Sequence, residues 1–102
     1  MAIAKLPDDA VLYHKTAQFT ETTVPAGLLR DHRTKDGAWG VIRVLEGKLA
    51  YRLKDARRPQ TEYLLTPKTI PVVIEPTIAH EVEPCGAVRF FIEFYRREKG
   101  TS

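Results

Sequence analysis

Short runs rich in β-branched and aromatic residues recur about every ten residues along this chain, and they constrain its fold more than any other feature. Clear examples are Trp39–Leu45, Leu49–Leu53 and Val88–Tyr95. Residues of these types favour extended strands. No window shows a sustained apolar period of 3.6 residues, so long amphipathic helices are not expected. The pattern predicts an all-β sandwich or small barrel.

Turn signals separate the predicted strands. We expect strands at 11–15, 19–25, 28–33, 39–45, 49–53, 61–66, 70–75, 79–83 and 88–95. Thr34–Gly37 and Glu83–Gly86 are predicted turns, and Glu46–Lys48 is predicted as a hairpin turn in which Gly47 supplies the positive φ. At 102 residues the chain is expected to form one domain, 1–102, with residues 1–10 as a loose arm and 96–102 as a polar tail.

Charge and cysteine content restrict the partners. The net charge of +3, from 16 basic and 13 acidic residues, is too mild to indicate nucleic-acid binding. No stretch approaches the ~20 apolar residues of a membrane span, and the N-terminus lacks the apolar core of a signal peptide. The single cysteine, Cys85, permits no intrachain disulfide and is expected to be an exposed thiol. A cytoplasmic location follows as the expectation.

The stretch Val72–Glu83 carries the most suggestive residue. It is a short apolar run, a turn at Pro76, and a histidine that opens a second run. His80 shares a strand face with Val82 and is therefore expected to point inward. His32 lies near a turn in another predicted strand. His14, in the first strand, is expected to be a surface or half-buried histidine without a ligand role.

Glu93 needs a partner. It lies in a strand with apolar residues on both faces, which is typical of a strand buried on both sides. A buried carboxylate costs several kcal/mol unless it is paired or bound to a cation. One solution is a metal shared with His32 and His80, in a facial triad with open positions for water or substrate. The other is an ion pair with Arg30, Arg43 or Arg52, and spacing alone does not decide between the two.

Four segments carry a family resemblance: PAGLLRDHRTKDGAWG (25–40), VLEGKL (44–49), VIEPTIAHEVEP (73–84) and FIEFY (91–95). In this order and spacing they resemble the small cupin-like family that includes YeaR and the N-terminal domain of the tellurite-resistance protein TehB. The resemblance implies a double-stranded β-helix, or jelly-roll, barrel. It also implies a divalent-metal site with His32, His80 and Glu93 as ligands, zinc as the expected ion and iron as the alternative.

The chain departs from the wider cupin pattern at two positions. Thr34 lies two residues after His32, where metal cupins carry a second histidine. Gly40 stands where they carry a glutamate. The usual four-ligand set is therefore absent, which argues against ordinary cupin oxygenase chemistry.

Two functions remain open from the sequence. The first is a metal-binding cupin of a stress or metalloid response, which takes a small molecule or an oxyanion at the open coordination positions. The second is a non-catalytic interaction or dimerisation module with a vestigial site. Exposed strand edges invite pairing, which makes a homodimer the expected assembly.

Overall fold

The structure is a computed structural model that describes residues 5–30 and 32–98. Its elements are β1 (Ala10–Lys15), β2 (Phe19–Thr20), the 3-10 helix η1 (Ala26–Leu28), β3 (Trp39–Leu53), β4 (Thr61–Leu65), β5 (Val72–Ile74) and β6 (His80–Arg97). The strands form one antiparallel sheet in the order β1-β6-β3-β4, with β2 paired to β6 and β5 paired to β3. The predicted all-β class is confirmed.

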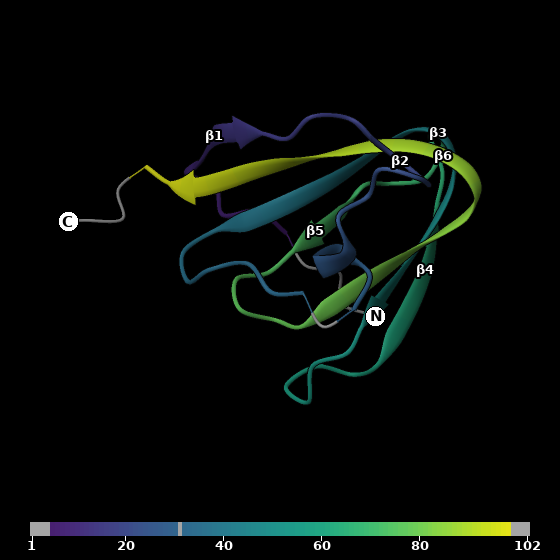
Figure 1. Ribbon diagram of the computed structural model, residues 1–102. Coiled ribbons are helices and arrows are strands. Elements are labelled where there is room, and N and C mark those ends of the chain that lie inside the picture. The colour runs from purple at the N-terminus through teal and green to yellow at the C-terminus, as the bar shows by residue number, and fades with distance from the viewer. Residues whose placement is uncertain (1–4, 31, 99–102) are drawn as a thin grey trace.

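The two longest strands, β3 and β6, pair with each other and bend together. Gly47 in β3 and Gly86 in β6 have φ values of 80° and 85°. The pairing register shifts on both sides of Gly47, and such bulges bend a strand and increase its twist. Figure 1 shows two arms diverging from this bend, with β5 and η1 between them.

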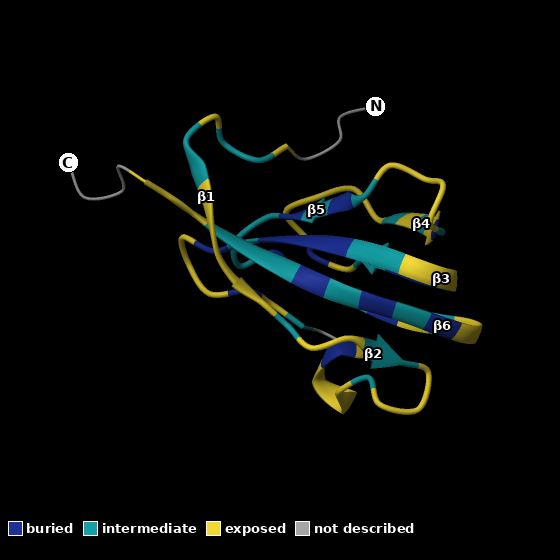
Figure 2. Ribbon diagram, turned by 90° about the horizontal axis from the view of Figure 1, so that it is seen from above, coloured by how far each residue is buried: buried dark blue, intermediate teal, exposed yellow. Residues whose placement is uncertain are grey.

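The core fills the space inside the bend. Along β6, buried and half-buried residues alternate, as Figure 2 shows, because successive side chains point to opposite faces. The inward residues of both long strands meet those of the shorter elements. The buried cluster consists of Leu28, Ile42, Leu49, Tyr51, Leu65, Val72, Ile74, Val82, Val88, Phe90 and Ile92. Each fully buried apolar side chain contributes about 1.5–3 kcal/mol to stability.

The predicted reversals at Glu46–Lys48 and Glu83–Gly86 are wrong. Both segments lie inside continuous strands, where their glycines serve the bend and the chain does not turn back. A positive-φ glycine suits either role, and only the partner strand distinguishes them. The predicted strand at 28–33 is also wrong for its described residues: Leu28 belongs to η1, and only His32 forms a β-bridge, with His80. Asp31 lies outside the described residues.

The chain ends differ in part from the prediction. Ala10 pairs with Arg97, so β6 includes two residues that the sequence placed in a polar tail. Residues 1–4 of the predicted arm lie outside the described residues. Within the described part of the chain, no helix is long and apolar enough to span a membrane.

Replacing Gly47 by alanine should destabilise the fold strongly. A Cβ at this position would stand 2.0 Å from the carbonyl oxygen of Ala87, on a backbone whose φ is +80°. The clash and the backbone strain together should cost about 3 kcal/mol or more. Gly37 is the matched control, because it has the same φ and open space around it. Gly37→Ala should therefore cost only about 1 kcal/mol. Urea unfolding of both variants measures the difference, and equal losses would contradict the role of the bend.

Candidate functional site

The two predicted histidines meet inside the fold. Nδ1 of His32 lies 3.1 Å from Nε2 of His80. The backbones of the two residues also exchange hydrogen bonds, with N–O distances of 2.8 and 2.9 Å. His80 points inward, as predicted, and is only 1% exposed. Its ring stacks on Tyr51, with centroids 5.7 Å apart.

The hydrogen bonds of this pair fix which ring nitrogens carry protons. Nδ1 of His80 lies 3.2 Å from the carbonyl oxygen of Ile78, which can only accept, so Nδ1 carries a hydrogen. Burial lowers the pKa of His80 to about 4 and also lowers the pKa of His32, so both rings are neutral near pH 7. Nε2 of His80 is then an acceptor, and Nδ1–H of His32 donates to it. Nε2 of His32 is left as an unprotonated nitrogen.

The turn that precedes His80 is held by hydrogen bonds to Thr77 and Ala79. Thr77 adopts a φ of 64°, a strained conformation for a β-branched residue that costs about 1–3 kcal/mol. Its carbonyl accepts hydrogen bonds from Arg33 at 3.1 Å and Arg57 at 2.7 Å. Asp55, itself 5% exposed, accepts from both arginines and from the backbone N–H of Ala79. Chiefly through the bond from Arg57, these contacts hold the pKa of Asp55 well below its usual range.

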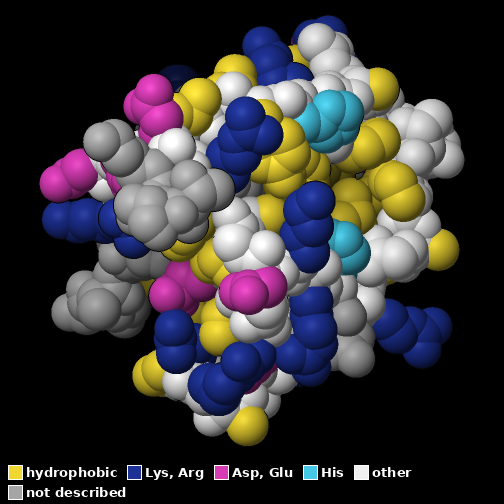
Figure 3. All heavy atoms as spheres, turned by 90° about the vertical axis from the view of Figure 1, so that its left-hand side faces the viewer, with side chains coloured by type: hydrophobic (Ala, Val, Ile, Leu, Met, Phe, Trp, Pro, Cys, Tyr) yellow, Lys and Arg dark blue, Asp and Glu magenta, His cyan; other side chains and the backbone are white. Residues whose placement is uncertain are grey.

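His32 forms part of the wall of a pocket of about 310 Å³, which we call the histidine pocket. The pocket is lined by Tyr13, His14, His32, Arg33, Thr34, Lys35, Ala38 and Phe94. These described lining residues are aromatic, small or basic, and none of them is acidic. On the face drawn in Figure 3, histidine side chains lie beside hydrophobic atoms, with Lys and Arg side chains around them. Such a surface suits a small anionic ligand.

Glu93 does not join the histidines. Its Oε1 accepts hydrogen bonds from Nε of Arg43 at 2.8 Å and from the hydroxyl of Tyr95 at 3.2 Å. It follows the core residue Ile92 in β6 and therefore points to the opposite face of the sheet. The arginine alternative for Glu93 is thus the one that the structure shows. The bond to Glu93 is also the main reason that the pKa of Arg43 is raised.

The residues present fit the predicted metal site only in part. Two imidazole ligands at about 2.0–2.1 Å from a tetrahedral zinc ion lie about 3.3 Å apart, close to the spacing of His32 and His80. Across residues 5–30 and 32–98, however, no three His, Cys, Asp or Glu side chains come together as a metal would require. Metal binding at His32, His80 and Glu93 stays a prediction.

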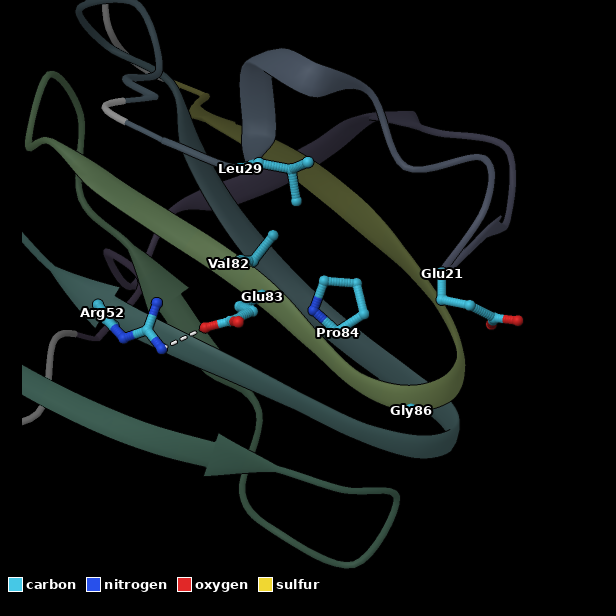
Figure 4. A pocket seen from close by; sticks show the side chains of 7 residues that line it. All are labelled: Glu21, Leu29, Arg52, Val82, Glu83, Pro84 and Gly86. Carbon is cyan, nitrogen blue, oxygen red and sulfur yellow. Dashed lines mark hydrogen bonds and ion pairs between the residues drawn. The ribbon is translucent and has the colours of Figure 1, made fainter.

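A larger hollow of about 600 Å³ lies elsewhere, between Leu29 and the first half of β6. In Figure 4, Val82 points toward Leu29, and Glu83 turns toward Arg52. The charged groups here already have partners. Arg52 bonds to Glu62, Glu81 and Glu83, and the carboxylate of Glu21 accepts the N–H of Val88 at 3.0 Å. This hollow therefore offers a ligand fewer available polar groups than the histidine pocket.

Sequence reasoning missed the contribution of the first strand. His14, expected to have no ligand role, lies in the pocket wall and stacks on Phe94 with ring centroids 6.0 Å apart. The pairing of His14 with Phe94 across β1 and β6 brings it there. No local signal in the sequence specifies that register, because the two residues are 80 positions apart along the chain.

The fold and the pocket define a small antiparallel β domain organised around a hydrogen-bonded histidine pair, of which His80 is buried and His32 half-buried. The chain belongs to the TehB-like domain family, whose model matches residues 14–92. It is 30% identical over 79 residues to the probable S-adenosyl-L-methionine-dependent methyltransferase TehB of Haemophilus influenzae strain Rd. It is 29% identical over 79 residues to TehB of strain 10810. The TehB part of the predicted resemblance is confirmed.

These matches cover 76% of this chain and 28% of each TehB protein, so the chain spans less than a third of the length of its relatives. The crystal structure of Haemophilus influenzae TehB superposes with a TM-score of 0.80 and 26% identity, over 88% of this chain and 32% of TehB. A crystal structure of a protein from Escherichia coli K12 gives a TM-score of 0.82 at 20% identity, over 95% of this chain and all of that protein. The latter likeness shows the fold alone.

Stability should fall as the pH drops from about 6.5 to 4, because of His80. The pKa of His80 is about 4 in the folded protein, against an ordinary value of 6.5. Between these two pH values the imidazole is protonated in the unfolded chain but neutral in the native state, so protonation favours unfolding. The full effect corresponds to about 3 kcal/mol. His80→Phe keeps a ring against Tyr51 and should flatten the slope within this window. Urea unfolding across the pH range measures both proteins, and parallel curves would contradict the assignment.

Proposed function

We propose that this protein binds a small oxyanion in the histidine pocket as part of a stress or metalloid response. The observation that carries the proposal is the composition of the pocket wall. Arg33 and Lys35 supply positive charge, and His32 supplies a hydrogen-bonding nitrogen. No acidic residue is among the described lining residues, so Lys35 in particular can attract an anion, whereas Arg33 shares its charge with Asp55.

Family membership supports this proposal. The relatives are named as probable methyltransferases, and the match covers 79 residues, or 28% of each of them. We therefore propose a binding role for the domain that this chain shares with them. We further propose that the bent sheet is a small cupin-type jelly-roll barrel and that the protein works in the cytoplasm.

A metal remains part of the proposal. His32 and His80 would be its imidazole ligands, and Glu93 would have to leave Arg43 and move from the opposite face of the sheet to join them. Zinc is the expected ion, and iron the alternative. A bound divalent ion would supply Lewis acidity and an additional charge toward an anion. Elemental analysis of the purified wild-type protein tests for stoichiometric metal, and the His80→Ala variant should lose that metal.

An interaction module is the second candidate, and exposed apolar residues favour it. β1 and β4 lie at the two ends of the paired strand order in the described chain. Leu12 in β1 and Leu64 in β4 are 42% and 51% exposed. A homodimer through either edge would cover them. Light scattering of the wild type and of Leu64→Glu and Leu12→Glu variants distinguishes the two edges.

Isothermal titration with tellurite and phosphate should show saturable binding with a dissociation constant of about 1 mM or tighter, which corresponds to about −4 kcal/mol. The background should be Cys85→Ser, because tellurite reacts with thiols and Cys85 is exposed. Lys35→Ala and His32→Ala should each weaken binding about tenfold, because each removes one polar contact to the anion.

Glu62→Gln is the control. It changes an exposed carboxylate that bonds to Arg52, lies outside the histidine pocket and has no part in the proposed metal site, so it should leave the affinity unchanged. Absence of saturable binding for every oxyanion tested would refute the proposed function. Equal affinity in the Lys35→Ala and wild-type proteins would place the binding elsewhere.

A further inference from the structure

The hydrogen-bond chain behind the pocket has a fixed direction. It starts at the carbonyl oxygen of Ile78, passes through the ring of His80 and ends at the ring of His32. A carbonyl cannot donate, so each ring must donate through Nδ1 and accept through Nε2. The end of the chain, Nε2 of His32, is then an acceptor on a residue that lines the histidine pocket. No residue in the described part of the chain donates to it.

We propose that the histidine pocket selects oxyanions that carry a hydroxyl group, because His32 offers Nε2 as a hydrogen-bond acceptor. The inference rests on the anion-binding part of the proposed function and specifies its ligand class for the metal-free protein, because a metal between the two rings would displace the hydrogen from Nδ1 of His32. The hydroxyl of the ligand donates to His32, and the charged oxygens face the basic side chains. Lys35 is the main one of these, because Arg33 is paired with Asp55. An anion without a hydroxyl would place an oxygen lone pair against the lone pair of Nε2. Sites built around one hydrogen bond reject analogues that lack its partner.

His80 is a positioning residue in this scheme. It is only 1% exposed and does not line the pocket, so it acts on the ligand through His32. Its Nε2 accepts the Nδ1–H of His32 and thereby keeps the hydrogen off Nε2 of His32. The ring of His80 is itself fixed by Ile78 and by stacking on Tyr51. An outer residue that orients a functional histidine in this way is a common device in protein sites.

Hydrogen tellurite and iodate form a matched pair of probes. Both are pyramidal trioxo anions with a single negative charge near neutral pH, and their central atoms are isoelectronic. Hydrogen tellurite carries one hydroxyl and iodate carries none. In the Cys85→Ser background, which removes the single thiol, hydrogen tellurite should bind about tenfold tighter than iodate, or about 1.4 kcal/mol.

Substitutions distinguish selection for a hydroxyl group from simple attraction of an anion to positive charge. His32→Phe should reduce the ratio of the two affinities to about one, whereas Lys35→Ala should weaken both anions and keep the ratio. His80→Phe should also abolish the preference, because Nδ1–H of His32 then has no acceptor. His80→Gln should restore it, since an amide oxygen can accept from His32 while the amide nitrogen donates to Ile78.

The outcomes are distinct. If both anions bind with equal affinity, the inference is wrong and the proposed function stands. If iodate binds tighter, Nε2 of His32 is a donor, as it would be with a metal between the two rings. If neither binds, the proposed function fails. Nitrogen NMR of the imidazoles then tests the proton positions directly, and a hydrogen on Nε2 of His32 would overturn the inference.

Discussion

The shared bend of β3 and β6 is the constraint on which the rest of the structure depends. His80 and Phe94 lie at opposite ends of the same strand, and 14 residues of straight strand would span about 46 Å. Yet His80 contacts His32, and Phe94 lines the same pocket as His32. The bend at Gly47 and Gly86 folds the strand pair over the core and so brings its two ends toward one site.

Beside His80, a strained backbone segment is stabilised by hydrogen bonds that also satisfy buried polar groups. Thr77 holds an unfavourable backbone conformation, and its carbonyl is bonded by two arginines that also bind the buried carboxylate of Asp55. Beside this corner, the buried ring of His80 has a partner for each nitrogen. Polar groups inside a fold are tolerated when each is paired, and here the pairing also sets the chemistry that His32 presents to the pocket.

Part of this protein could be predicted from its sequence because the relevant signals are local. Recurring short runs of β-branched and aromatic residues predict the all-β class, and the segment around Pro76 predicts a turn followed by an inward-pointing His80. The apolar strand around Glu93 predicts that this carboxylate is bound either by a metal or by an arginine. Arg43 could not be chosen over the metal, because that choice depends on which strand face Glu93 occupies, and this in turn depends on the register of β6 against β3.

The sequence by itself determined an all-β domain, the inward direction of His80 and the need of Glu93 for a cationic partner. Only the tertiary structure decided that Gly47 bends a strand and does not reverse the chain, that His14 joins the pocket wall, and that Glu93 stands apart from the histidines. The physical reason is that neighbouring residues along the chain decide whether a segment forms a strand. The meeting of side chains follows from pairing between segments distant in the chain.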